Sequence, residues 1–272
     1  MPSPTEITVS QLSKLIGLPQ SPVLVDVRED AECDNDRRTI PGAIRRLAVD
    51  PAAWARDFNG KPVVIVCQSG GELSQGTAAW LRHDGIQAET LAGGFAAWAS
   101  ANLPLVLSGK LPQRDAAGRT VWVTRARPKI DRIACPWLIK RFVDPTAVFL
   151  FVAPSEVRAT AERFQATPFD VDDVFWSHRG ERCTFDTMVD EFGLELPALR
   201  HLATIVRAAD TARLDLAPEA AGLLAISLGY SRMYRDDLAQ LDSAMNVYDG
   251  LYRWCRDATD ETHNWPTNKS ST

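Results

Sequence analysis

The sequence predicts an α/β fold in two domains, the first of which contains a mostly parallel sheet. Its 272 residues are 45% hydrophobic, which is enough apolar material for a sizeable core without disulfide bonds. In the first half, short apolar runs alternate with segments of helical spacing, a pattern typical of parallel strands covered by helices. A polar stretch with two glycines and a proline, Ser108–Arg119, interrupts this alternation.

This break, together with the polar end of the chain, sets the expected domain boundaries. We place the first domain at residues 1–108, a linker at 109–119, the second domain at 120–258 and a flexible tail at 259–272.

In the first domain, Ser10 is expected to cap a short helix over Gln11–Ile16. Apolar runs predict three buried strands, and periodic segments that follow proline or glycine predict three further helices. The strands are Val23–Val27, Pro62–Cys67 and Glu89–Leu91, and the helices are Pro51–Phe58, Leu73–Asp84 and Phe95–Ala101.

The second domain is predicted to be a mixed, helix-rich α/β domain with its helices crowded toward the end. Val121–Thr124 and Ala147–Val152 are expected strands, and Thr167–Cys183 is irregular. Asp131 is a candidate cap for the first helix. The expected helices are Arg132–Phe142, Pro154–Gln165, Phe185–Phe192, Pro197–Ala209, Pro218–Ser227 and Asp237–Cys255.

Charge and cysteine content exclude several classes of protein. Lys and Arg total 30 against 35 Asp and Glu, so the chain lacks the basic surplus of a general nucleic-acid binder. No apolar run approaches the about 18 residues of a membrane span, and the N-terminus does not look like a signal peptide. Five scattered cysteines argue against a disulfide framework. We therefore expect a cytoplasmic protein without membrane or nucleic-acid partners.

Cys67 stands at the end of a predicted buried strand, before a glycine-rich loop and a helix. Loop amides and a helix N-terminus can stabilise a thiolate at such a position, and Gly70 and Gly71 let the loop curl around a small group. The alternative is that Cys67 is a buried core thiol.

Four sequence blocks in this half resemble a single rhodanese domain over about residues 5–105: VLVDVR at 23–28, IPGA at 40–43, VIVCQSG at 64–70 and LAGGFAAW at 91–98. The resemblance implies a five-stranded parallel sheet flanked by helices. It also implies that Cys67 takes a sulfane sulfur from a small donor as a persulfide and passes it to a thiol or cyanide-like acceptor. The persulfide would be held by the loop Gln68, Ser69, Gly70, Gly71, Glu72 and Leu73, with Asp26 and Arg28 bracing that loop as an ion pair.

Two features depart from the rhodanese pattern. Glu72 occupies a position where a basic residue is common, and its carboxylate would oppose thiolate formation and anion binding. Arg38 and Thr39 replace a frequent Gly-His pair. We therefore expect weak turnover of thiosulfate.

The second half offers a candidate anion site at the start of a helix. Lys129 and Arg132 flank the predicted helix N-terminus, where backbone N–H groups favour anions. The alternative is that Arg132 and Asp131 pair with surface neighbours.

The same half offers a candidate metal site. His178 lies in an irregular loop, and Asp210 and Glu219 flank a turn that could bring two carboxylates together around zinc or iron. Cys183 is a further candidate ligand, although a thiolate would bias the site toward zinc. Asp186 is either a donor or a helix cap. The alternative without metal is that Asp210 and Glu219 pair with the nearby arginines Arg207 and Arg213.

Long segments of residues 122–255, among them RPKIDRIACPWLIKRFVDP and HRGERCTFD, resemble the C-terminal domain of bacterial chromate-resistance proteins. This resemblance implies a role in chromate or related oxyanion stress. We therefore expect a sulfurtransferase linked to oxyanion resistance, with no cofactor needed for sulfur transfer, a divalent metal in the second domain and an oxyanion as a further ligand. The alternative is a non-catalytic sensor that responds to an oxyanion or a metal.

Overall fold

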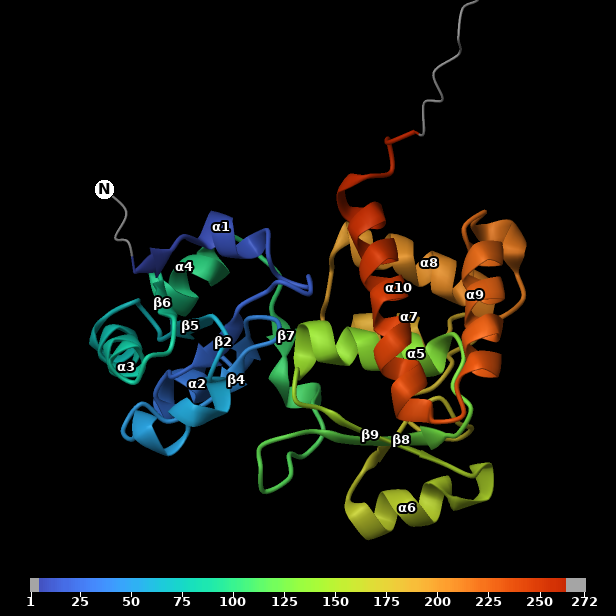
Figure 1. Cartoon of the computed structure of the whole chain (residues 1–272), viewed down its shortest axis with the longest axis horizontal. Coiled ribbons are helices and arrows are strands. Elements are labelled where there is room, and N and C mark those ends of the chain that lie inside the picture. Colours follow the sequence, from blue (N-terminus) through green and yellow to red (C-terminus); the bar gives the residue numbers. More distant parts are fainter. Residues whose placement is uncertain (1–4, 263–272) are drawn as a thin grey trace, which may run out of the picture.

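The structure is a computed structural model that describes residues 5–262 (Figure 1). Its strands are β1 (Glu6–Ile7), β2 (Val23–Asp26), β3 (Arg38–Thr39), β4 (Ile44–Arg45), β5 (Val63–Val66), β6 (Ala88–Leu91), β7 (Val106–Leu107), β8 (Val121–Arg125), β9 (Val148–Val152) and β10 (Thr167–Pro168). Its α-helices are α1 (Val9–Ser13), α2 (Asp30–Asn35), α3 (Glu72–His83), α4 (Gly94–Ser100), α5 (Asp131–Leu138), α6 (Val157–Phe164), α7 (Thr184–Glu191), α8 (Pro197–Asp210), α9 (Ala220–Met233) and α10 (Asp237–Asp257). Short 3₁₀ or π turns cover Pro51–Ala53, Ala55–Phe58, Ser108–Lys110, Ile139–Val143, Pro154–Glu156 and Leu214–Leu216.

The first half forms a five-stranded sheet in the order β1-β6-β5-β2-β4, and every neighbouring pair is parallel. The predicted parallel five-stranded sheet is therefore confirmed. Because β2 and β5 run in register, with Asp26 opposite Val66, their carboxyl ends meet at one edge of the sheet. Asp26 and the residue after β5, Cys67, consequently lie at the same edge.

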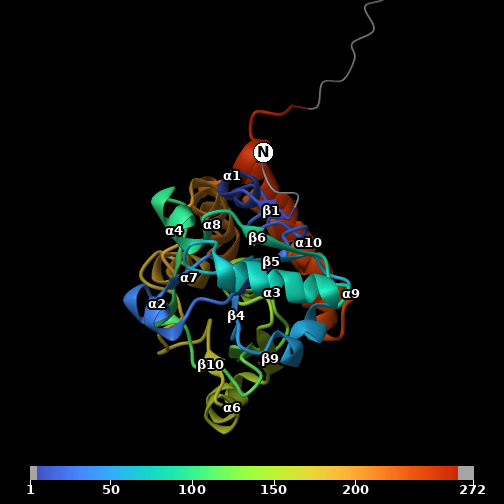
Figure 2. The same cartoon turned by 90° about the vertical axis from the view of Figure 1, so that its left-hand side faces the viewer.

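Both faces of this sheet are buried. Along β5, Val64 and Val66 belong to one hydrophobic cluster, whereas Val63 and Ile65 belong to another. This division follows from the alternation of side chains along a strand. The second cluster lies under α3, which crosses the front of the molecule in Figure 2. The first cluster includes residues of α1 and α4.

The second half contains a smaller parallel sheet in the order β10-β8-β9. Helix α6 packs on one face of this sheet, where Val157 contacts Val123 in a small cluster. The other face presents Trp122 and Phe149 to the large hydrophobic cluster. Figure 1 shows α5, α7, α8, α9 and α10 gathered on this side, with α6 on the opposite side. The helix-rich α/β architecture is as predicted.

The two halves share one hydrophobic core. The first cluster runs from α1 and α4 without interruption into α5, α7, α8 and α10 of the second half. Close backbone contacts reinforce it, since the amide of Gly42 donates to the carbonyl of Phe142 at 2.7 Å and that of Leu107 to Phe192 at 3.0 Å. A Cβ atom at Gly17 would lie 2.3 Å from the Phe142 ring, so glycine is needed there for the halves to approach.

Local differences from the sequence-based predictions have local causes. Thr8, not Ser10, caps α1, because its side chain accepts from the amide of Gln11 in a capping box. Residues Pro51–Phe58 form two 3₁₀ turns that meet at Trp54 instead of one helix. Helix α5 begins one residue early, at Asp131, and continues past Leu138 as a π turn.

None of the helices within residues 5–262 has the length and apolarity needed to cross a bilayer. Residues 263–272 of the predicted tail lie outside the described residues.

We predict that limited proteolysis cuts first within Ser108–Arg119. Gly109, Ala116 and Ala117 are exposed there, and exposed loop segments with small residues are preferred sites of proteolysis. Because the halves share a core, the two fragments should stay associated in gel filtration after the cut. A first cut elsewhere would show that this segment is protected. Separation of the fragments would show that the shared core is too weak to hold the halves together.

Candidate functional site

Cys67 directly follows β5 and lies within the first half of the chain, at the carboxyl edge of the sheet. Its side chain is buried, and its Sγ lies 3.1 Å from Oγ of Ser74 in the first turn of α3. The Ser74 hydroxyl donates to the carbonyl of Gly71. The Cys67 thiol therefore donates to the Ser74 hydroxyl.

The loop after Cys67 is held by a close approach to the start of α4. The amides of Phe95 and Ala96 donate to the carbonyls of Cys67 and Gln68, both at 2.9 Å. Gly94 has a φ of +59°, and a Cβ there would lie 2.4 Å from the Cys67 carbonyl oxygen. Gly70, at φ +76°, faces the same turn. Only glycine fits at Gly94 without displacing the loop.

The loop also carries a run of unused hydrogen-bond donors. In the described part of the chain, none of the backbone amides from Gln68 to Ser74 donates to a protein acceptor. The Gln75 side chain binds the carbonyl of Gly70, which fixes the loop from the helix side. Such a run at a helix N-terminus is suited to binding an anion.

The remaining loop side chains differ in their surroundings. Ser69 and Glu72 are exposed, and Glu72 is the first residue of α3. Leu73 packs on the cluster under α3. The Oε1 atom of Gln68 is buried without a hydrogen-bond partner among the described residues.

Asp26 and Arg28 form the predicted ion pair at 2.9 Å, and both are buried. The Arg28 guanidinium stacks on the Phe95 ring at 3.8 Å and donates to the carbonyls of Asp36 and Arg38. Because the amide of Phe95 binds the Cys67 carbonyl, the pair braces the loop through α4 rather than by direct contact.

The second half contains a cluster of one histidine and three carboxylates, which we call the His178 cluster. Nε2 of His178 lies 3.4 Å from Oδ2 of Asp131, 3.4 Å from Oδ1 of Asp170 and 3.3 Å from Oδ2 of Asp210. Asp131 is the first residue of α5 and Asp210 the last residue of α8. Asp170 follows β10 with a φ of +51°, and His178 precedes α7.

Neighbouring groups hold the carboxylates of this cluster in place. The amide of Thr184, at the start of α7, donates to Oδ2 of Asp131 at 2.6 Å, and its hydroxyl donates to Oδ1 of Asp170 at 2.9 Å. Arg132 and Arg125 both lie 3.3 Å from Oδ2 of Asp170. Every oxygen of Asp170 thus has a partner.

The cluster shifts the titration of its members. Hydrogen bonds to Asp131, Asp170 and Asp210 raise the pKa of His178 well above its ordinary value. Burial raises the pKa of Asp131, against the opposing hydrogen bond from His178. Burial also acts to raise the pKa of Asp170, but hydrogen bonds from His178 and Thr184 outweigh it and the net shift is downward. The three carboxylates thus favour the protonated form of His178.

The sequence-predicted ligands are only partly brought together. His178 and Asp210 meet, but Glu219 lies before α9, where its charge acts on the Cys255 thiol, and it is not part of the cluster. Cys183 is buried next to Asp131, and burial raises the pKa of its thiol. Asp186 accepts from the amide of Cys183 at 3.1 Å, which is the capping role.

The arginines proposed as partners pair elsewhere. Arg207 binds Asp186 at 2.9 Å and Arg213 binds Asp215 at 3.1 Å, so neither neutralises Asp210. Arg132 donates to the carbonyls of Arg125 and Ala126 and pairs with Asp170. Arg132 is thereby engaged by protein groups, whereas Lys129 is exposed.

Sequence reasoning missed three residues of these sites. Asp131 was interpreted as a helix cap, although its carboxylate binds α7 instead of its own helix. Asp170 carries no local signal. Ser74 could have been found, because it follows Cys67 by one loop and one helical turn.

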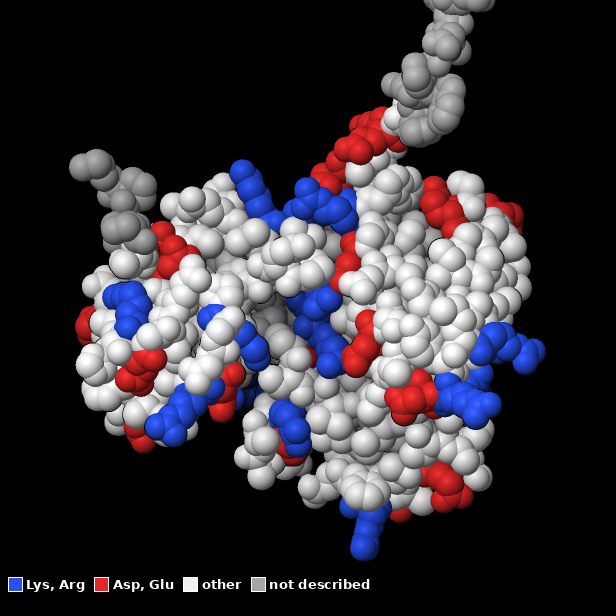
Figure 3. Space-filling model, viewed as in Figure 1, with Lys and Arg blue, Asp and Glu red and all other residues white. Residues whose placement is uncertain are grey.

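A third feature is a cleft between the two halves. Figure 3 shows Lys and Arg side chains gathered in the hollow there. The cavity has a volume of about 340 Å³. Five cations and one carboxylate line it: Arg46, Lys61, Arg119, Lys140, Arg141 and Asp57.

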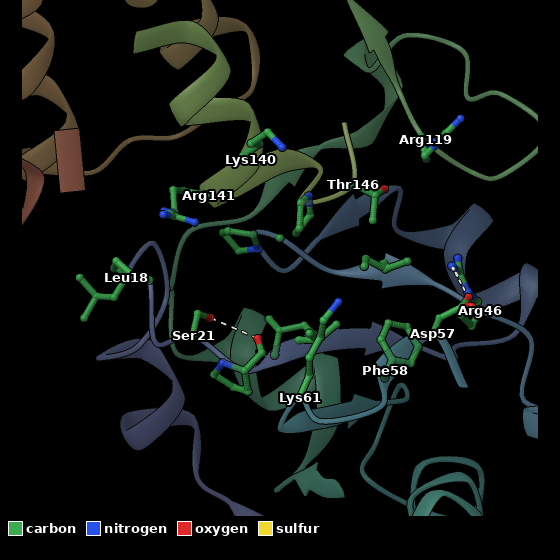
Figure 4. Close-up of a pocket in the computed structure, with 18 of the residues that line it drawn as sticks. Leu18, Ser21, Arg46, Asp57, Phe58, Lys61, Arg119, Lys140, Arg141 and Thr146 are labelled. Carbon is green, nitrogen blue, oxygen red and sulfur yellow. Dashed lines mark hydrogen bonds and ion pairs between the residues drawn. The ribbon is translucent and has the colours of Figure 1, made fainter. Parts of the chain in front are cut away.

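Some of these cations are already neutralised. Arg141 binds Asp249 at 2.8 Å, and Arg46 lies 3.6 Å from Asp57. Within residues 5–262, Lys61 and Lys140 have no ion-pair partner, and the ammonium of Lys140 faces only the Phe149 ring, at 5.9 Å. Figure 4 shows Lys61 reaching into the cavity from the first half, with Lys140 and Arg141 on the side of the second half. This interdomain cleft is therefore the most cationic cavity described.

Comparison with known proteins assigns a family to each half. Residues 8–101 match the rhodanese-like domain, and residues 122–255 match the C-terminal domain of ChrB. A rhodanese-like domain protein from Staphylococcus aureus is 32% identical over 35% of this chain and 90% of its own, with a TM-score of 0.31. A structure from Staphylococcus saprophyticus is 28% identical over 36% of this chain and 96% of its own, with a TM-score of 0.32.

The curated relative is the protein ChrB of Cupriavidus metallidurans. It is 36% identical over 153 residues, which are 55% of this chain and 45% of that protein. The match thus spans less than half of the relative. The chain combines a rhodanese-like domain at residues 8–101 with a ChrB C-terminal domain at residues 122–255.

Proposed function

We propose that the chain is a rhodanese-type sulfurtransferase that acts in resistance to chromate or a related oxyanion. The observation that carries the proposal is the position of Cys67 at the start of a loop whose amides, from Gln68 to Ser74, are unused. The relation of the second domain to ChrB supports the link to chromate resistance.

The chemistry has two half-reactions. The Cys67 thiolate attacks the sulfane sulfur of the donor, and the rest of the donor leaves with the electron pair of the broken sulfur bond. The resulting persulfide anion is stabilised by the loop amides. A thiolate or cyanide-like acceptor then attacks the outer sulfur, and Cys67 leaves as the thiolate. No metal or organic cofactor takes part in these steps.

We predict that Cys67→Ser abolishes persulfide formation. Mass spectrometry of the intact chain after exposure to a sulfane donor should show one added sulfur atom in the wild type and none in the variant. Cys33→Ser and Cys255→Ser are the controls, since both thiols lie outside the loop, and they should keep the added sulfur. If the wild type gains no sulfur, the rhodanese-like domain does not turn over and the non-catalytic alternative is correct.

We also predict that Glu72→Arg lowers the KM for thiosulfate. The substitution replaces repulsion of an anion by attraction at the mouth of the loop. Because Glu72 is exposed, solvent screening limits the gain to about 1 kcal/mol, or roughly fivefold in KM. Glu162→Arg makes the same charge change on exposed α6 of the second domain and should leave KM unchanged. Equal effects of both variants would point to net charge rather than to the loop.

A second function, oxyanion binding, is favoured by the interdomain cleft. Its lining carries five cations against one carboxylate, and Lys61 and Lys140 approach it from different domains. Lysine ammonium groups without carboxylate partners are available to a tetrahedral dianion such as sulfate or chromate. Binding there, rather than at Lys129 and Arg132, accounts best for an oxyanion ligand.

We predict that Lys61→Ala and Lys140→Ala each weaken sulfate and chromate binding. Each lost charged contact is worth about 1.5 kcal/mol, or roughly tenfold in Kd. Isothermal titration of the full chain measures this. Lys129→Ala removes an exposed lysine outside the cleft and should have no effect. Unchanged affinity in both cleft variants would remove the cleft from consideration.

A further inference from the structure

We propose that Asp131, Asp170 and His178 bind a first-row divalent cation, with Asp210 completing the site on its solvent side. This inference concerns the ChrB C-terminal domain and is independent of sulfur transfer at Cys67. It differs from the ligand set that the sequence suggests, because Asp131 and Asp170 replace Glu219 and Cys183.

The first argument is the convergence of donor atoms on one point. One ligand atom each from Asp131, Asp170 and His178 lie within 4.8 Å of one another. Three carboxylate oxygens surround a single nitrogen, Nε2 of His178, at 3.3–3.4 Å. One N–H group cannot donate well to three acceptors, whereas a cation placed among them can bind several oxygens and the nitrogen together.

The second argument is an unpartnered carboxylate oxygen on a member of the cluster. The Asp131 side chain is only 1% exposed, and its Oδ1 has no hydrogen-bond partner among the described residues. A buried carboxylate oxygen without a partner is costly, because burial removes its hydration and nothing replaces it. A metal ion bound to Asp131 supplies the missing interaction.

The third argument comes from the groups behind the ligands. Thr184 donates its amide to Asp131 and its hydroxyl to Asp170, so it fixes both carboxylates. Arg132 and Arg125 hold the far oxygen of Asp170. Outer partners of this kind orient metal-binding carboxylates and tune their affinity. The arginines also offset the excess negative charge of the cluster.

The donor set selects the class of metal. Carboxylate oxygens with one imidazole nitrogen suit Mn²⁺ or Fe²⁺, whereas thiolate ligands would favour zinc. The His178 side chain is 40% exposed and that of Asp210 is 22% exposed, so the cluster opens to solvent on that side. A site with an open side leaves a coordination position for water or an anion.

Manganese binding to the full chain, stripped beforehand with a chelator, tests the proposal. Titration with Mn²⁺, followed by electron paramagnetic resonance, should show saturable binding of a single ion per chain. Asp131→Asn and His178→Ala should each weaken binding tenfold or more. Asp210→Asn should weaken it less, because Asp210 is not among the three residues whose ligand atoms lie within 4.8 Å of one another.

The controls separate this ligand set from the sequence-derived one. Glu219→Gln and His201→Ala change similar groups of the same domain outside the cluster and should bind Mn²⁺ like the wild type. Circular dichroism of each variant, compared with the wild type, shows whether the variant is folded. If Asp131→Asn does not fold, the test passes to His178→Ala and Asp210→Asn, which change partly exposed side chains.

Two results would overturn the proposal. One is the absence of saturable binding of Mn²⁺, Fe²⁺ and Zn²⁺ by the wild type. The other is undiminished binding in folded His178→Ala, or a loss in Glu219→Gln as large as in that variant.

Discussion

Burial of both faces of the five-stranded sheet is the constraint on which most of the structure depends. A parallel sheet cannot leave a face in water when its strands are apolar throughout, as β5 is. Helix α3 covers one face, and α1 and α4 begin the layer on the other. That layer continues into the second domain through Phe142 and Phe192. Since each large buried side chain contributes about 1.5–3 kcal/mol, the shared core couples the two domains strongly.

The same constraint determines where the reactive thiol lies. Because α4 must pack on the sheet, its first turn approaches the end of β5 so closely that only glycine fits at Gly94. The backbone of that turn then holds the Cys67 loop, and Arg28 holds the turn by stacking on Phe95. The loop amides are left without internal acceptors as a consequence. The conformation that would bind a persulfide is therefore fixed by packing rather than by side chains of the loop itself.

The sequence predicted what depends on local pattern. Buried strands are continuous apolar runs, and the Cys67 loop lies within a few residues of its strand and helix, so both were found. The His178 cluster depends on four segments far apart in the chain, and only His178 and Asp210 were selected. Asp131 carries the same local signature as a helix cap, and its contact with α7 is visible only in three dimensions. Glu219 was expected beside Asp210, but α9 starts on the far side of a 3₁₀ turn and carries it away.

Charge pairing in the second domain explains why the proposed anion site and the proposed metal site lie in different places. Arg132, the cation nominated by the sequence, is used to hold Asp170 and is not available to an anion. In the proposed site the acidic ends of α5 and α8 bind a cation, while Lys61 and Lys140 line the cleft between the two domains. An anion at Lys61 and Lys140 would contact both domains. By linkage, its binding energy would add to the free energy that holds them together. Oxyanion binding would in this way stabilise the interface that also supports the sheet carrying Cys67.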